Sequence, residues 1–255
     1  MRVDKQHWLY TKQIAHRGLH NAEHPENTMG AFERAMEMGY AIETDVQLTK
    51  DNVVVVFHDG DLARATGGAD KRVLSDTLYE ELQSVRLFGS DEGIPTFAEL
   101  LQQVNGRVPL LIELKKNNTG GGHALSELTA KLLDGYTGAY AVQSFNPFIL
   151  KWFKKNRPDM LRGQLSSFFD GSHGMGIRKY VLKHMLYNKS VRPDFISYDL
   201  NNLPNPYVDK YVRRFDVPVL AWTVHCPHCL KTVAGHCDNI IFEGFIPPEK
   251  LWDKE

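Results

Sequence analysis

Short apolar runs alternate with amphipathic segments along nearly the whole chain, and this alternation constrains the fold more than any other feature. Runs of this kind are typical of buried strands, and segments of helical period between them are typical of repeated βα units. The eight strand candidates lie at 13–18, 40–46, 109–115, 139–145, 160–165, 194–199, 218–224 and 238–244. The pattern therefore predicts an α/β protein built on a parallel sheet.

Eight parallel strands can close into a (β/α)₈ barrel or form an open, doubly wound sheet. Open sheets that bind a dinucleotide carry a glycine-rich turn after the first strand, and no such turn follows residues 13–18. The length of 255 residues also suits one barrel. We therefore predict a (β/α)₈ barrel that forms a single domain over residues 1–255.

The region after the second strand departs from the regular repeat. The segment TKDN at 49–52 reads as a tight turn, so the following VVVVFHD is predicted to pair antiparallel with the strand before it. The stretch from about 59 to 94 is longer than one connection requires. We predict that it is an insertion covering the barrel mouth, because long loops in compact domains are usually functional.

The charge balance argues against a general attraction to polyanions. Thirty Lys and Arg residues stand against thirty-one Asp and Glu residues, so no overall field favours nucleic acid or an anionic membrane. No apolar run is long enough for stable insertion into a membrane, and the first residues, MRVDKQHWLYTKQ, lack the apolar segment of a signal peptide. These features predict a cytoplasmic protein whose anion binding is local, and they leave its oligomeric state open.

Three cysteines, Cys226, Cys229 and Cys237, lie close together. Their odd number does not indicate a secreted disulfide framework. The C-x₂-C spacing and the neighbouring histidines match a zinc site, but these residues follow a strand and continue into an amphipathic segment. We favour reduced cysteines packed under a helix, with their role left open.

Charged residues interrupt the strand ends, where a barrel carries its functional groups. Glu43 and Asp45 are two residues apart and so share one face of their strand, as Glu113 and Lys115 do on the next barrel strand. Three carboxylates facing the lumen would be costly without a cation, and oxygen ligands favour Mg²⁺ or Ca²⁺. Ordinary charges paired with Lys or Arg are the alternative.

Two histidines and an arginine stand at strand ends close to these carboxylates. His16 and Arg17 end the first predicted strand, and His58 ends the predicted hairpin strand. Imidazoles exchange protons near neutral pH, and an arginine can hold phosphoryl oxygens. A lone histidine at a strand end is more often structural, but this combination fits the hydrolysis of a phosphodiester.

Six segments resemble, in order, the signatures of the glycerophosphodiester phosphodiesterase family. They are AHRG (15–18), PENT (25–28), ETDVQLTKD (43–51), VVFHD (55–59), IELK (112–115) and QSFNP (143–147), with later strands similar to PDFISYDLNNLP (193–204) and VLAWTV (219–224). The resemblance covers most of the chain. It implies a (β/α)₈ barrel with a divalent metal that hydrolyses a small glycerophosphodiester to glycerol 3-phosphate and an alcohol, a reaction of lipid and glycerol metabolism.

The resemblance also implies roles for single residues. The implied catalytic acid/base pair is His16 and His58, the substrate- or phosphate-binding residues are Arg17, Lys115 and Trp222, and the metal ligands are Glu43, Asp45 and Glu113. A barrel-core role for the tryptophan fits equally well. In this family the glycerol hydroxyl of the substrate is thought to attack phosphorus, and water then opens the cyclic phosphate.

Two positions depart from the family pattern, and two other functions remain as alternatives. Asn52 stands where glycine is common, which a left-handed turn tolerates, and Glu243 stands where the last strand usually carries Thr-Asp. A lysophospholipase-D-like enzyme would differ only in its leaving group, but residues 59–94 are mostly polar. A non-catalytic barrel that binds a polyol phosphate would be expected to lack a histidine or carboxylate, and these positions are all filled.

Overall fold

The computed structural model describes residues 3–115, 122–168 and 176–252. The chain comprises two compact units. One, called the N-terminal unit here, is residues 15–142, and the other, the C-terminal unit, is residues 1–14 with 143–255.

The order of elements is that of a (β/α)₈ barrel, as predicted. Each predicted run overlaps a strand of the barrel, and a helix lies between each of these strands and the next. The strands are β1 (Ile14–Ala15), β2 (Ala41–Leu48), β4 (Leu110–Leu114), β5 (Tyr140–Ser144), β6 (Arg162–Ser166), β7 (Phe195–Asp199), β8 (Val219–Val224) and β9 (Asn239–Phe242).

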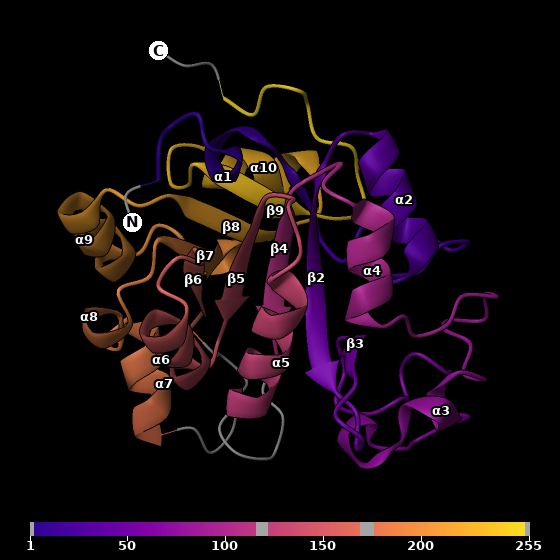
Figure 1. The fold of residues 1–255 in the computed structure, drawn as a ribbon. Coiled ribbons are helices and arrows are strands. Elements are labelled where there is room, and N and C mark those ends of the chain that lie inside the picture. The colour runs from indigo at the N-terminus through magenta and orange to yellow at the C-terminus, as the bar shows by residue number, and fades with distance from the viewer. Residues whose placement is uncertain (1–2, 116–121, 169–175, 253–255) are drawn as a thin grey trace. The chain divides into compact units, whose positions relative to one another are not determined.

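In the N-terminal unit, β2 is the long purple strand of Figure 1. It pairs in parallel with β4 and antiparallel with β3 (Val54–Val56), which confirms the predicted hairpin. Asn52 in the turn has φ +62°, so its side chain tolerates the left-handed backbone that the sequence suggests. The helices of this unit are α2 (Met29–Glu37), α3 (Tyr79–Leu82), α4 (Phe97–Val104) and α5 (His123–Leu133).

Helix α2 fixes the approach of the chain to the site. Thr28 caps its N-terminus by accepting a hydrogen bond from the backbone N–H of Ala31, and Gly39 follows its end with φ +71°. Its buried residues, Ala31, Phe32, Ala35 and Met36, form one apolar face. Helix α2 is therefore the amphipathic segment that the sequence pattern predicts between the first two strands.

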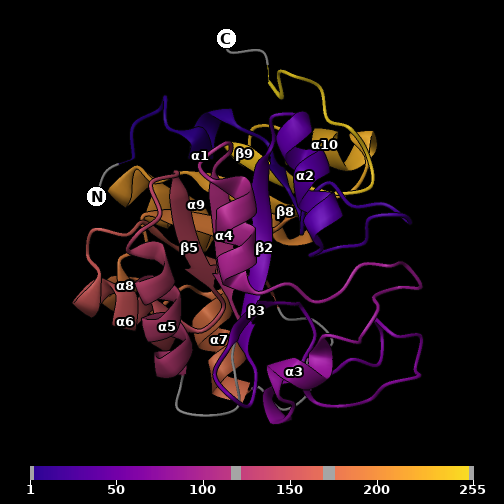
Figure 2. The same ribbon diagram turned by 45° about the vertical axis from the view of Figure 1, so that its right-hand side comes forward.

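The stretch from 59 to 94 contains a 3₁₀ turn, η1 (Leu74–Asp76), and the short helix α3. Figure 2 shows α3 and its flanking loops beside β3. Apolar side chains of this stretch pack with Val55 and Phe57 in a small core; they are Leu62, Ala65, Leu74, Leu82, Val85, Leu87 and Ile94. The hairpin thus anchors the insertion. That the insertion covers the barrel mouth, and that residues 1–255 form a single domain, stay predictions.

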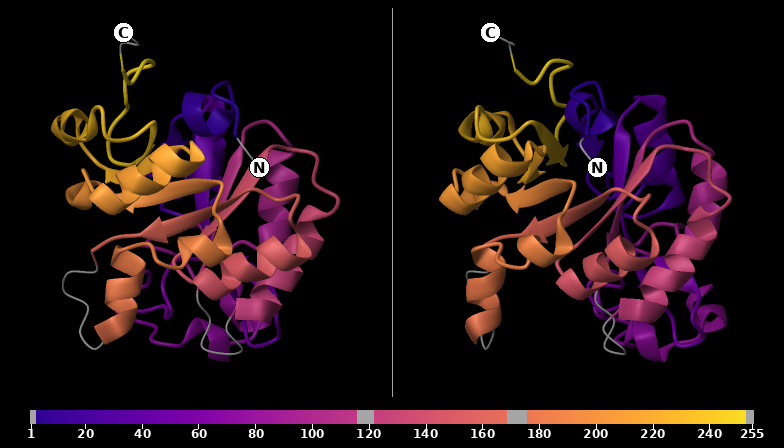
Figure 3. Two further views of the ribbon diagram at one scale, coloured as in Figure 1. Left: turned by 90° about the vertical axis from the view of Figure 1, so that its left-hand side faces the viewer. Right: turned by 60° about the vertical axis from the view of Figure 1, so that its left-hand side comes forward.

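In the C-terminal unit, β6 pairs with β7, β7 with β8 and β8 with β9, all in parallel. These strands and their helices form the orange-to-yellow ribbon of Figure 3. Helix α6 (Pro147–Asn156) begins at Pro147, because proline suits the first helical position. The other helical elements are α1 (Trp8–Thr11), α7 (Gly176–Lys183), α8 (Asn188–Val191), η3 (Leu200–Asn202), α9 (Pro206–Phe215) and α10 (Pro227–Val233). In the described ranges no helix combines the length and the apolar character needed to cross a bilayer.

The prediction of three reduced cysteines was wrong for two of them. Cys226 and Cys229 form a disulfide, because the C-x₂-C turn brings their Cα atoms to 5.1 Å, a separation that a disulfide accepts. Cys237 is a free thiol, and burial raises its pKa to about 12. Within the described residues, these cysteines belong to no set of three side chains close enough to share a metal ion.

Candidate active site

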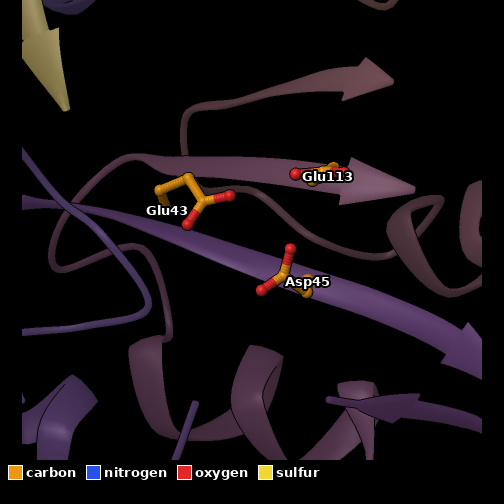
Figure 4. Close-up of side chains that lie close together, drawn as sticks. All are labelled: Glu43, Asp45 and Glu113. Atoms are coloured by element: carbon orange, nitrogen blue, oxygen red, sulfur yellow. The ribbon is translucent and has the colours of Figure 1, made fainter. Parts of the chain in front are cut away.

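Three carboxylates gather on β2 and β4 (Figure 4). Asp45 and Glu113 are register partners across the two parallel strands, and Glu43 lies two residues before Asp45 on the same face. One ligand oxygen from each lies within 4.8 Å of the others, and all three side chains are buried. The strand pattern predicted that these three carboxylates converge if both strand faces point into the lumen, and in the structure they lie together.

Two cations from the same unit face these carboxylates. Lys115 Nζ lies 2.9 Å from Asp45 Oδ1 and 2.8 Å from Glu113 Oε1. Arg17 Nε lies 3.3 Å from Asp45 Oδ2. Burial alone would raise the pKa of Asp45, but the charges of Lys115 and Arg17 hold it well below its usual range.

The other two carboxyl groups are poorly compensated. Burial, together with the charges of Asp45 and Glu113, raises the pKa of Glu43 well above its ordinary value. Burial likewise raises the pKa of Glu113 to about 7, although Lys115 opposes the shift. A buried set of oxygen donors that is short of positive charge fits a hard divalent cation.

The turn after β1 places His16 and Arg17 beside Glu43. Arg17 adopts φ +55°, and its backbone N–H donates to Glu43 Oε2 at 3.1 Å. His16 Nε2 lies 3.9 Å from the same oxygen. A Cβ on Gly18 would stand 2.8 Å from the backbone carbon of Ala31, so the turn can approach α2 this closely only with glycine.

Asn27 fixes the position of Asp45. Its amide Nδ2 donates to Asp45 Oδ2 at 2.8 Å, and its Oδ1 accepts from Thr44 Oγ1 at 3.0 Å. The backbone N–H of Asn27 donates to the carbonyl of Arg17 at 2.9 Å. The sequence interpretation assigned no role to Asn27, although its segment, PENT, was one of those that carried the resemblance.

His58 is held by its neighbour in sequence. Its Nδ1 lies 2.6 Å from Asp59 Oδ1, and because the carboxylate accepts, Nδ1 carries the hydrogen and Nε2 is left for proton transfer. Burial lowers the pKa of His58 below its ordinary value, and the charges of Lys115 and Arg17 act in the same direction. These effects favour a neutral imidazole that can accept a proton.

Arg64, from the insertion, joins the two sides of the site. Its Nε donates to Asp59 Oδ2 at 2.6 Å, and its Nη1 and Nη2 donate to the two carboxylate oxygens of Glu26 at 3.0 and 2.6 Å. Glu26 Oε1 also accepts from Arg17 Nη1 at 2.6 Å. A continuous line of contacts therefore runs from His58 through Arg64 to Arg17.

The sequence interpretation missed three members of this line, Glu26, Asp59 and Arg64. Glu26 and Asp59 lie in the segments PENT and VVFHD, so their position in those motifs was an available signal. Arg64 lies in the insertion and offered no signal of its own.

Trp222 lies near the end of β8 in the C-terminal unit. Its ring packs edge to face against Phe145, with 5.6 Å between the ring centroids. In the same unit the backbone N–H of Glu243 donates to the carbonyl of Val224 at 3.0 Å, which continues the pairing of β9 with β8. A contact between Trp222 and substrate stays a prediction.

The fold and the sequence are both similar to known phosphodiesterases. A phosphodiesterase of Oleispira antarctica, solved in complex with the product sn-glycerol-3-phosphate, has a TM-score of 0.74 at 24% identity, over 91% of this chain and 92% of that one. A glycerophosphodiester phosphodiesterase of Caldanaerobacter subterraneus is 35% identical over 62% of this chain and 67% of its own length. A human lysophospholipase D is 36% identical over 50% of this chain and 43% of its own length.

The chain thus spans about two thirds or less of the length of these curated relatives. The family comparison covers much more of it, since the model of the glycerophosphoryl diester phosphodiesterase family matches residues 16–238. That range includes all of the N-terminal unit except Ala15 and with it every carboxylate, histidine and cation of the site. The chain belongs to the glycerophosphoryl diester phosphodiesterase family.

Proposed function

We propose that this protein hydrolyses glycerophosphodiesters to glycerol 3-phosphate and an alcohol with the help of one divalent cation, Mg²⁺ or Ca²⁺. The observation that carries the proposal is the buried set of Glu43, Asp45 and Glu113, whose ligand oxygens lie within 4.8 Å of one another. Membership of the family and the names of the relatives support the same reaction.

The three carboxylates would hold the cation, which supplies charge to polarise the phosphoryl group when it is bound. Arg17 and Lys115 border the same carboxylates and would bind the remaining phosphoryl oxygens. Glu26 and Asp45 engage the Arg17 guanidinium from two directions, so its orientation is set before a substrate arrives. The phosphate is thereby oriented for in-line attack.

Proton transfer falls to the two histidines. His58 has its Nδ1 engaged by Asp59, so its Nε2 takes a proton from the attacking hydroxyl or gives one to the leaving oxygen. His16 directly follows β1, and its Nε2 lies 3.9 Å from Glu43 Oε2. It takes the role opposite to that of His58. If the glycerol hydroxyl of the substrate attacks first, the two roles exchange when water opens the cyclic phosphate.

The test is release of glycerol 3-phosphate from glycerophosphocholine and glycerophosphoethanolamine, with Mg²⁺ or Ca²⁺ and after chelation. We expect release that chelation abolishes and that either ion restores. The Glu113→Gln variant should show the same loss without chelation, because it removes one charged donor. Release that persists after thorough chelation would contradict the metal requirement, and no release with any ion would contradict the substrate class.

A lysophospholipase-D-like activity is the second candidate. The insertion exposes three large apolar residues, Val73, Leu78 and Phe88, which are 38–41% exposed, and one human relative carries the name lysophospholipase D. Such residues could contact an acyl chain. Comparing kcat/KM for lysophosphatidylcholine and glycerophosphocholine separates the two candidates, and a Phe88→Ser variant should lower only the former value if the insertion binds the acyl chain.

A further inference from the structure

The C-terminal unit contains a disulfide that the proposed reaction does not use. Cys226 and Cys229 are bonded to each other across Pro227 and His228, immediately after the end of β8. Both cysteines belong to this unit, whereas all the carboxylates, histidines and cations of the proposed site belong to the N-terminal unit. The pair therefore needs an explanation of its own.

The segment that contains this pair is open to solvent. Both cysteines are partly exposed, and the flanking residues His225, Pro227 and His228 are exposed. Thiol–disulfide exchange needs access of an attacking thiolate to a disulfide sulfur, and accessible disulfides are the more reactive ones. The third cysteine differs, since burial raises the pKa of the Cys237 thiol to about 12 and makes it a poor nucleophile.

The disulfide also does little to hold the fold together. It joins residues three apart in sequence, and a disulfide that closes so short a loop removes little conformational entropy from the unfolded chain. In addition, the Cys226 sulfur accepts the backbone N–H of Cys229 at 3.0 Å. This N–H would donate to the sulfur as it leaves, which favours release of Cys226 in a thiol–disulfide exchange.

We propose that Cys226 and Cys229 form a redox-active pair that exchanges electrons with dithiols. One thiolate of the dithiol attacks a sulfur of the pair, forms a mixed disulfide and releases the other cysteine, which takes up a proton. The second thiol of the dithiol then attacks the sulfur of the mixed disulfide that belongs to the dithiol, and this releases the second cysteine. Two electrons and two protons pass to the protein, and the dithiol becomes a disulfide.

The experiment uses the full chain with a Cys237→Ser substitution, so that Cys226 and Cys229 are the only sulfurs that a maleimide can modify. Folded, oxidised protein is treated with dithiothreitol, quenched in acid and alkylated with a polyethylene glycol maleimide. We expect two modified sulfurs, formed at a rate within about tenfold of that in the urea-unfolded chain because the disulfide is accessible. Treatment of the reduced, folded protein with glutathione disulfide should then re-form the disulfide, so that alkylation modifies no sulfur.

The matched control adds Cys226→Ser and should show one modified sulfur before and after dithiothreitol. A folded protein that stays unmodified until urea is added would overturn the proposal, because the disulfide would then be inert. A reduced, folded protein that keeps both thiols in excess glutathione disulfide would overturn it as well.

A second measurement keeps the test valid if the Cys237→Ser variant does not fold, since Cys237 is partly buried beside the carbonyl of Val233. The unsubstituted chain is alkylated before and after dithiothreitol, and the labels are located by mass spectrometry of its peptides. New labels on Cys226 and Cys229 support the proposal, and new labels on Cys237 alone contradict it. The result is independent of whether the chain hydrolyses any phosphodiester.

Discussion

Both units bury charged groups, but the charges are balanced in one and unbalanced in the other. In the C-terminal unit, Arg162 and Asp194 form a one-to-one pair, with Nη1 3.5 Å from Oδ2. In the N-terminal unit, three carboxylates face the cations Lys115 and Arg17. Since an unpaired buried charge is costly, the first arrangement is complete by itself and the second leaves a place for another cation.

The surroundings of the two clusters agree with this difference. Arg162 begins β6 and Asp194 directly precedes β7, so the pair lies at the amino ends of parallel strands, where barrel residues serve stability. The Arg162 guanidinium also donates to the backbone carbonyls of Met160, Val191 and Arg192. By contrast, Asp45 and Glu113 lie toward the carboxyl halves of β2 and β4, the side that carries chemistry in this fold.

The largest effect is expected from the proton-transfer groups of the N-terminal unit. His58→Ala should lower kcat for glycerophosphocholine by about 10²–10⁴ and leave the thermal unfolding midpoint nearly unchanged. His236→Ala, at an exposed position of the C-terminal unit, is the matched control and should keep full turnover. If both variants retain the activity of the parent chain, the assignment of acid and base chemistry to His58 is wrong.

The next effect is a difference in the free energy of unfolding between variants of the Arg162–Asp194 pair and of the three-carboxylate cluster. Asp194→Asn leaves Arg162 without its carboxylate and should lower the free energy of unfolding by about 3–5 kcal/mol, while the folded fraction keeps its kcat. Glu113→Gln removes a repelling charge and, measured in chelator, should leave that free energy unchanged or higher while kcat falls. Urea unfolding of both variants checks this, and equal destabilisation of the two would mean that the clusters do not differ.

The sequence allowed the strands to be found because each is a short apolar run. The first run was too long: β1 ends at Ala15 because Arg17 and Gly18 both turn into the left-handed region. The carboxylates were predictable from the period of two along a strand, which puts Glu43 and Asp45 on one face. The pairing of Asp45 with Glu113 across the two strands could not be predicted, because it depends on how the strands align in space.

Contacts between distant segments explain most of what was missed. Arg64 and Glu26 are 38 residues apart, and no local pattern in a single sequence links them. The disulfide was missed for a different reason, because C-x₂-C spacing suits metal binding, reduced thiols and disulfides alike. The cytoplasmic location and the roles of the site residues stay predictions until they are measured.

A moderate effect is expected at Arg64, the residue that links the insertion to the site. Arg64→Gln removes its hydrogen bonds to Asp59 and Glu26, so His58 and Arg17 lose a common support and kcat should fall by about tenfold, or 1.4 kcal/mol. Arg64→Lys should restore little of it, because an ammonium cannot span both carboxylates.

Arg72 provides the control for this substitution within the same insertion. It pairs with its near neighbour Asp70 at 2.6 Å, so Arg72→Gln should leave kcat unchanged. A similar loss in both variants would show that any change of charge in the insertion disturbs catalysis, and Arg64 would then have no particular part in positioning His58.

The smallest effect concerns acid stability, and its sign follows from the same contacts. Burial alone would raise the pKa of Glu26, but the hydrogen bonds and charges of Arg64 and Arg17 hold it below its ordinary value. Asp59 behaves in the same way under Arg64 and His58. Because both folded-state values are lowered, the unfolded chain binds more protons in acid, so this stabilisation is present above about pH 4.5 and is lost as the pH falls below it.

The side chain of Arg64 is 48% exposed, so solvent screening limits the effect to about 1 kcal/mol. Urea unfolding at about pH 7 should therefore show the parent chain to be more stable than Arg64→Gln by about this amount, and at about pH 3.5 the difference should shrink. A difference that does not change with pH would locate the stabilisation elsewhere, in the packing of the Arg64 guanidinium 5.2 Å from the ring centroid of Phe88. The charge of Arg64 would then matter less than its contact with the insertion, because packing, unlike an ion pair, does not depend on the protonation of Glu26 and Asp59.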